Sequence, residues 1–308
     1  MLVGQSPEIM AVKKMIREIA KTNESALITG EVGTGKKQIA REIHHRSRQK
    51  NRSLVVLNCT AVGDTISDGD LFGAKVDGPH GIERKLGVFE QAKKGILYLE
   101  NVDELNPDFQ QKLYNILKES KYKKPSAKEF TPVTFRVIAS TTDTDILKSD
   151  KVRRDLLSLI STHTVHIPPL RKRKQDIPLL FSKFLDSVCE EYERELPNVP
   201  AELFESLIEY EWRGNVYELK NAIKNIVLMS QEGELSVEYL PFEVKRHPFD
   251  VLIDHSLPSA VHEVEKFLIR KSLRKFAGNQ TKAAKALSVS EAALRYKMKK
   301  FGFSRKAF

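Results

Sequence analysis

The chain has 308 residues, of which 41% are hydrophobic and 30% are charged, a composition typical of a globular protein with two or three domains. No apolar run approaches the roughly 20 residues that cross a bilayer, and the first residues do not resemble a signal peptide. The only cysteines, Cys59 and Cys189, are too few for a disulfide framework. We therefore expect a cytoplasmic protein that is not associated with a membrane.

The net charge of +10 is concentrated at one end of the chain. Residues 263–308 contain 13 Lys or Arg and 3 Asp or Glu, whereas the rest of the chain has 38 of each sign. A basic terminal block is typical either of a solvated tail or of a segment that binds a polyanion.

Strands and helices alternate through the first half of the chain. Helical patterns cover residues 10–20, 38–46 and 107–119, and short apolar strands are predicted at 26–29, 54–57, 96–99, 135–139 and 165–167. This alternation predicts a parallel sheet covered by helices on both faces. The basic run at 121–124 is interpreted as a solvated loop.

The second half of the chain is predicted to be helical. Residues 176–193, 200–209 and 216–230 have the pattern of a small all-helical domain in which Trp212 packs. Two prolines and the lack of a periodic pattern indicate a linker near 247–258. Three short helices are then expected between 263 and 303.

A glycine-rich loop follows the first strand: Gly30-Glu31-Val32-Gly33-Thr34-Gly35-Lys36-Lys37. In such loops the backbone N–H groups converge on phosphate oxygens, and Lys36 would supply a cation for the β- and γ-phosphates. The Ser or Thr that usually follows this lysine, and helps to hold Mg²⁺, is replaced by Lys37. The loop predicts an ATP or ADP site, the alternative being a glycine turn with a chance lysine.

The strand at 96–99 ends in Glu100-Asn101, where an active NTPase usually carries Asp-Glu. Glu100 is the candidate ligand for Mg²⁺, but Asn101 cannot act as a general base at neutral pH. We therefore expect nucleotide binding with impaired hydrolysis. In an alternative register Asp103-Glu104 would be the acidic pair, and the nucleotide would then have to lie far from the strand end.

The basic end of the chain has the pattern of a helix-turn-helix. Residues 278–287 predict a turn and a short helix, and Ser290 is a natural N-cap for a helix over 291–300. Ala283 and Ala284 would let two helices cross closely over a core that contains Leu287, Val289, Leu294 and Met298.

The second of these helices is predicted to enter the major groove of double-stranded DNA. The candidates for contact with bases are Ser290, Glu291, Ala292 and Arg295. The candidates for contact with phosphates are Lys282, Tyr296, Lys297, Lys299 and Lys300. The alternative is a basic bundle that docks on a protein. Four residues of the preceding helix form either a dimer face or internal core: Val261, Val264, Leu268 and Leu273.

These segments, in this order, resemble the bacterial enhancer-binding proteins, the sigma-54-dependent transcription activators of the AAA+ family. The resemblance rests on the glycine loop (G-E-S-G-T-G-K in the family), on Asn58-Cys59, Leu71-Phe72-Gly73, Pro168-Pro169-Leu170-Arg171 and Asp176-Ile177-Pro178, on Trp212 to Val216 (W-P-G-N-V), and on a Fis-like helix-turn-helix. It implies an AAA+ α/β subdomain at 1–170, a helical lid at 171–243, a linker at 244–258 and a DNA-binding domain at 259–308. It also implies a homo-oligomer, either a dimer or a ring with ATP between subunits.

The chain departs from the family at the positions that carry its chemistry. Glu100-Asn101 stands at the Walker B acids, Thr142 at sensor I and Tyr217 at the sensor II arginine. Arg153 matches the first of two arginines that act in trans, whereas the second falls on Leu159. The sigma-contacting loop (G-A-F-T-G-A) aligns with residues 77–82, which lack its aromatic residue and its threonine.

These departures suggest a degenerate member of the family, for which three readings stay open. The chain is a DNA-binding regulator that holds ATP or ADP without efficient hydrolysis. Alternatively, it is an active ATPase that remodels the RNA polymerase holoenzyme carrying sigma-54. In the third reading it is a partner subunit that lends Arg153 to an intact relative.

Overall fold

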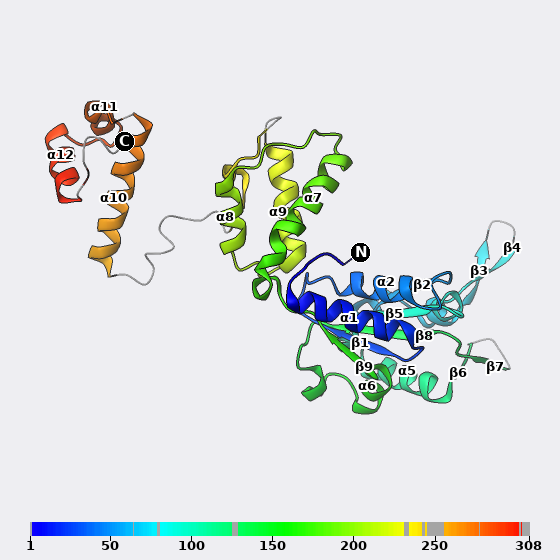
Figure 1. Ribbon diagram of the computed structural model, residues 1–308. Coiled ribbons are helices and arrows are strands. Elements are labelled where there is room, and N and C mark those ends of the chain that lie inside the picture. The colour runs from blue at the N-terminus through cyan, green and yellow to red at the C-terminus, as the bar shows by residue number, and fades with distance from the viewer. Residues whose placement is uncertain are drawn as a thin grey trace. The chain divides into compact units, whose positions relative to one another are not determined.

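The computed structural model describes residues 2–63, 65–78, 81–124, 129–230, 234–241, 244, 256–276, 278–301 and 303 (Figure 1). The chain divides into two compact units, Met1–Pro241 and Phe242–Phe308. Most of the predicted linker, residues 245–255, lies outside the described residues. Within the described ranges no helix is long and apolar enough to cross a membrane.

The first unit is built on a five-stranded parallel sheet, as the alternating pattern predicted. The strand order is β2-β5-β8-β1-β9. The bounds are β1 (Ala26–Thr29), β2 (Leu54–Asn58), β5 (Ile96–Glu100), β8 (Arg136–Thr141) and β9 (His163–His166). Thr29 pairs with Thr141 and Asn58 with Glu100, so the carboxyl ends of the strands meet at one edge of the sheet. The loops that follow those ends carry the predicted site.

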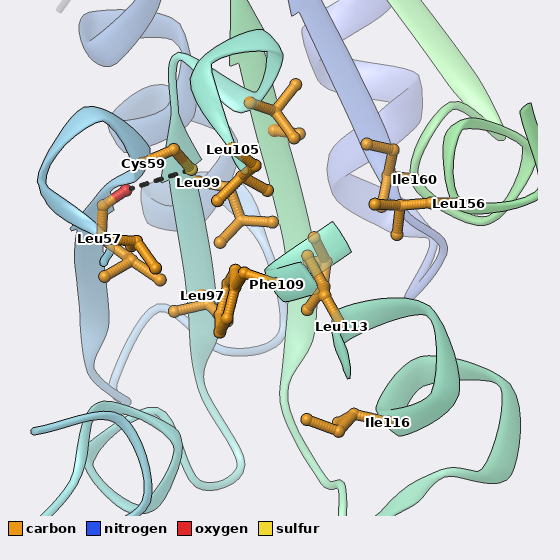
Figure 2. Packing of buried hydrophobic residues seen from close by; sticks show 14 of the residues in the cluster. Leu57, Cys59, Leu97, Leu99, Leu105, Phe109, Leu113, Ile116, Leu156 and Ile160 are labelled. Carbon is orange, nitrogen blue, oxygen red and sulfur yellow. Dashed lines mark hydrogen bonds between the residues drawn. The ribbon is translucent and has the colours of Figure 1, made fainter. Parts of the chain in front are cut away.

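Alternate side chains of the strands are buried on opposite faces of the sheet. Ala26 and Ile28 pack against α1 (Pro7–Lys21) and α2 (Lys36–Arg46). Leu27 belongs to the core on the other face, together with α5 (Pro107–Glu119) and α6 (Arg154–Ile160). Figure 2 shows Leu97 and Leu99 of β5 beside Phe109 and Leu113 of α5. Burial on both faces explains the continuous apolar runs Ala26–Ile28 in β1 and Ile96–Leu99 in β5.

Two buried charged side chains connect segments that lie far apart in the sequence. The guanidinium group of Arg136 donates to the backbone oxygens of Ile19, Thr22 and Glu24 at 2.7 to 3.0 Å, and burial lowers its pKa. The carboxylate of Asp176 accepts from Ser6 N at 2.8 Å and from Ser6 Oγ at 2.7 Å. Asp176 thereby fixes the start of α1 to the segment that enters the lid.

Two antiparallel hairpins extend from this unit: β3 (Ala74–Gly78) with β4 (Gly81–Lys85), and β6 (Lys121–Lys123) with β7 (Phe130–Pro132). The prediction of a solvated loop at 121–124 was wrong for β6. Tyr122 is 4% exposed and packs against Phe72 and Phe89, so the two lysines that flank it point outward from a short strand. The segment aligned with the sigma-contacting loop, 77–82, lies at the turn of the β3–β4 hairpin, and its residues 79 and 80 lie outside the described chain.

The lid consists of α7 (Ile177–Glu191), α8 (Ala201–Glu209) and α9 (Asn215–Met229). Trp212 is fully buried, as predicted, and its indole Nε1–H donates to Leu207 O at 2.7 Å. Two short helices, α3 (Asp68–Phe72) and α4 (Val88–Gln91), complete the first unit.

The second unit contains α10 (Leu257–Lys275), α11 (Gln280–Ala286) and α12 (Glu291–Lys300). α10 begins inside the segment predicted as linker. The core of the second unit comprises Ile269, Leu273, Ala283, Ala284, Leu294 and Met298. Leu273 is therefore a core residue and not part of a dimer face, whereas Val261 and Leu268 are exposed.

Val289 was expected in this core, but its side chain is 37% exposed. It lies in the turn between α11 and α12, where Ser288 adopts a left-handed backbone with a φ of 54°. The Val289 N–H bonds back to Ala284 O at 3.1 Å. The turn is therefore bonded back to α11 through its backbone, whereas Val289 is not part of the core.

Candidate functional site: a nucleotide cleft and a DNA-binding helix

The glycine loop joins β1 to α2 at the carboxyl edge of the sheet. Gly35 has a φ of 102° and is the N-cap of α2, and Gly33 has a φ of 76°. A Cβ atom on Gly33 would lie 2.0 Å from the Gly214 carbonyl oxygen of the lid, so the close approach of the two segments requires glycine. The loop is therefore shaped by both its own backbone and the lid.

The first turn of α2 is doubly cationic and contains no acidic residue. Lys36 Nζ donates to Gly30 O at 2.7 Å and to Glu31 O at 3.1 Å, which places the ammonium group inside the loop. Burial lowers the pKa of Lys36, and the carboxylates of Asp103 and Glu100 partly oppose that shift. A helix N-terminus with this charge is suited to a phosphate group.

The carboxylate of Glu31, predicted as part of the phosphate loop, is directed to the lid side. Arg171 binds it through two hydrogen bonds of 2.7 and 2.5 Å, and Asn215 Nδ2 donates to it at 3.2 Å. The hydrogen bond from Arg171, aided by Asn215, lowers the pKa of Glu31 from 4.5 to about 2. Glu31 is thus an ionised anchor between the loop and the lid.

Asn215 is the main polar contact between the lid and the phosphate loop. It is fully buried with a φ of 56°, its Oδ1 accepts from Leu170 N at 2.8 Å, and its Nδ2 donates to Val32 O at 2.9 Å. Two residues later, Tyr217 N donates to Gly33 O at 3.2 Å. The start of α9 therefore donates hydrogen bonds directly to the backbone of the phosphate loop.

A cleft of about 860 Å³ opens beside the phosphate loop. Nine predicted site residues line it: Val32, Gly33, Gly35, Lys36, Lys37, Glu100, Asn101, Thr142 and Tyr217. Gly30, Glu31 and Thr34 are not among the lining residues. Thr34 is 2% exposed, and its Oγ1 donates to Glu31 O at 2.7 Å, so it supports the loop from within.

The cleft also contains residues that were not predicted as site residues: Thr60, Phe184, Val216 and Lys220. Lys220 lies one helical turn after Tyr217 on α9, and this spacing of three residues was the only available signal for it. Its ammonium group brings a third cation to a cleft that already contains Lys36 and Lys37.

The acids near the end of β5 occupy different environments. Glu100 Oε2 lies 3.4 Å from Lys37 Nζ, and Asn101 has a left-handed φ of 58°. Asp103 is 9% exposed, and its Oδ1 has no hydrogen-bond partner among the described residues. Glu104 lines the same cleft as Glu100.

Cys59 lies beneath these acids and is fully buried. Burial, together with the carboxylates of Asp103 and Glu100, raises the pKa of its thiol to about 12. The thiol therefore stays protonated and is a packing group, not a nucleophile.

Arg153, the residue predicted to act in trans, lies outside the cleft at the start of α6. Its guanidinium group bonds to Asp155 at 3.1 and 2.6 Å and to Gln111, and it lies over the ring of Tyr114. Its side chain is 40% exposed. In the single chain, this arginine is held by its own neighbours and does not reach the phosphate loop.

In the second unit, α11 and α12 begin at side-chain caps. Asn279 Oδ1 accepts from Lys282 N at 3.0 Å, and Ser290 Oγ accepts from Ala293 N at 3.1 Å. The predicted N-cap and the predicted bounds of α12 are therefore confirmed. Small side chains at Ala283 and Ala284 are buried where α11 meets the rest of the unit.

Most of the predicted DNA contacts are exposed on this unit: Lys282, Ser290, Ala292, Arg295, Tyr296, Lys299 and Lys300. Glu291 is half-buried and accepts from Arg295 Nη2 at 2.5 Å. Lys297 is also half-buried and pairs with Glu265 of α10 at 2.6 Å, which lowers the pKa of Glu265. Lys297 thus has a partner inside the unit.

Comparison with known families agrees with this architecture. The sigma-54 interaction domain matches residues 2–166, the AAA+ ATPase lid domain matches 171–250, and the bacterial regulatory protein, Fis family, matches 260–301.

Known proteins match nearly the whole chain. The transcriptional activator RocR of Bacillus subtilis is 32% identical over 98% of this chain and 68% of its own length. A signal-transduction and transcriptional-control protein of Clostridium beijerinckii is 31% identical over 97% of this chain, which spans about half (48%) of that relative. Crystal structures of NtrX from Brucella abortus, in complex with ADP and with ATP, each match with a TM-score of 0.71 and 26% identity over 98% of this chain and 69% of theirs. This chain belongs to the sigma-54-dependent transcriptional activators.

Proposed function

We propose that this chain is a transcription regulator that binds ATP or ADP in the cleft beside the phosphate loop and hydrolyses it poorly. The observation that carries the proposal is the composition of the cleft. Lys36 and the N-terminus of α2 provide a phosphate site, whereas Glu100-Asn101 replaces the acids that would hold Mg²⁺ and orient water. The ADP and ATP complexes of NtrX support nucleotide binding by this fold.

We further propose that the second unit binds double-stranded DNA in the cytoplasm as part of a homo-oligomer, either a dimer or a ring. The exposed Val261 and Leu268 of α10 offer an apolar surface for a second copy. Arg295 is our candidate for base contact, and Lys282 and Lys299 are candidates for phosphate contact. Family members act on RNA polymerase, but residues 77–82 lack the aromatic residue and the threonine of the sigma-contacting loop.

Titration of the purified chain with labelled ATP and ADP, alongside a phosphate-release assay, tests the nucleotide site. We expect saturable binding, loss of binding in Lys36→Ala, and turnover close to background. The paired substitution Glu100→Asp with Asn101→Glu should raise turnover, because it restores a metal carboxylate and a water-orienting acid. Rapid hydrolysis by the unaltered chain, abolished by Lys36→Ala, would contradict the proposal.

One observation favours the active ATPase as a second candidate function. Glu104 lines the cleft together with Glu100, so an acid is available near the position that Asn101 cannot serve. In that case Glu104→Gln would abolish the turnover that the same assay detects. Under our proposal the unaltered chain already has turnover close to background, so Glu104→Gln does not change it.

A further inference from the structure

Lys37, which follows the phosphate-loop residue Lys36, interacts with Glu100 at the end of β5. Lys37 Nζ lies 3.4 Å from Glu100 Oε2, and the two side chains are 43% and 28% exposed. Both residues line the same cleft as Lys36 and Gly35. An internal ion pair is therefore located within the predicted nucleotide site, at the positions that hold Mg²⁺ in other phosphate-loop proteins.

The residues present do not fit a magnesium ion. Mg²⁺ requires oxygen ligands in a near-octahedral arrangement. An ammonium group at residue 37 has only donors, cannot ligate a cation and repels it. The carboxylate of Glu100, at the end of β5, is already paired with that ammonium group.

The other acids near β5 do not provide the missing oxygen ligands for Mg²⁺. Asp103 is buried and is not among the residues that line the cleft, whereas Glu104 lines it as a single further carboxylate on an exposed residue. Among the residues that the structure describes, no group of three or more His, Cys, Asp or Glu side chains is placed to hold a metal ion. Three lysines (Lys36, Lys37 and Lys220) and two carboxylates (Glu100 and Glu104) line the cleft, so the balance of charge favours an anion.

We propose that the Lys37 ammonium group replaces the magnesium ion as counter-charge, so that this chain binds ATP or ADP without a divalent cation. An ammonium group has three N–H donors, so Lys37 can keep its contact with Glu100 while it donates to a phosphate oxygen. The inference rests on the proposed nucleotide site and specifies the form of the ligand, the metal-free nucleotide.

The test compares the affinity of the full chain for fluorescent ADP and ATP in EDTA and in excess Mg²⁺. The unaltered chain should bind as tightly in EDTA as in Mg²⁺, or more tightly. Lys37→Thr removes the ammonium group and supplies a hydroxyl that can help to hold Mg²⁺. This variant should lose about tenfold in affinity in EDTA and recover in Mg²⁺. Lys14→Thr, at an exposed position on α1, is the matched control and should behave like the unaltered chain.

Binding of the unaltered chain only in the presence of Mg²⁺ would overturn the inference while leaving the nucleotide site intact. Absence of binding in both buffers, from protein with an intact thermal unfolding transition, would instead overturn the nucleotide site itself. Asp103→Asn provides a further check. If Asp103 held a metal, this variant would weaken binding in Mg²⁺. Under our proposal it leaves binding unchanged or strengthens it, because it removes a negative charge near Lys36.

Discussion

At the scale of single residues, the phosphate loop is anchored by side chains from the lid side. Glu31 is bound by Arg171 and by Asn215, which is 184 positions away in the sequence. Asn215 also holds Val32 O, and Leu170 N donates to Asn215. The loop residues were identified from their spacing, but the role of Glu31 as an anchor follows only from these long-range contacts.

The depressed pKa of Glu31 predicts a specific dependence of stability on acid. Its pKa in the folded chain, about 2, is below the ordinary value of 4.5. The ionised carboxylate therefore contributes stability above about pH 4.5, and this contribution is lost as the pH falls toward 2. The side chain is 34% exposed, so solvent screening limits the effect to on the order of 1 kcal/mol.

Chemical denaturation at several pH values measures this contribution. The free energy of unfolding should fall less between pH 4.5 and 2 in Glu31→Gln than in the unaltered chain. Glu205→Gln, on an exposed position of α8, controls for the loss of one carboxylate. Equal slopes for all three proteins would show that the Glu31 contact is not formed in solution.

At the scale of elements, the buried strands and the capped helices were predictable because their signals are local. β1 matched its predicted bounds, and α12 began directly after its Ser290 cap. The β6–β7 hairpin was missed because its only strong signal is one buried aromatic residue, Tyr122, between lysines. Val289 was placed wrongly because an apolar residue in a tight turn has no periodicity that indicates its direction.

The exposed surface of α12 predicts how two substitutions will differ. Arg295→Ala should cost roughly 1–3 kcal/mol on a cognate DNA site and much less on random DNA, because a base contact carries sequence information. Lys299→Ala should weaken binding to both DNAs alike, because phosphate contacts are insensitive to sequence. Mobility-shift titrations with the two DNAs measure both effects. An equal loss on both DNAs for Arg295→Ala would reassign it to the backbone.

At the scale of the whole molecule, charge and chemistry are divided between the two units. The first unit contains the cleft and almost no net charge, whereas residues 263–308 carry the whole surplus of 10 positive charges. Nucleotide and DNA are thus expected to bind through different parts of the chain. The apolar core of the second unit is formed by its own helices, from Ile269 to Met298.

This division predicts the behaviour of a chain that ends at residue 241. It should keep its affinity for ATP and ADP, because every residue lining the cleft precedes that point. It should lose DNA binding at all salt concentrations, because the basic segment is absent. Nucleotide titration and mobility-shift assays on the same preparation check both statements. Retention of DNA binding would place a DNA contact in the first unit.

The sequence by itself determined the phosphate loop, the parallel sheet and the helix-turn-helix, because glycine spacing, apolar runs and N-caps act over a few residues. Tertiary structure alone decided that Lys37 reaches Glu100, that Lys220 lines the cleft and that Lys297 pairs with Glu265. These contacts join segments that fold together from distant parts of the chain, and no local pattern records which side chains will meet.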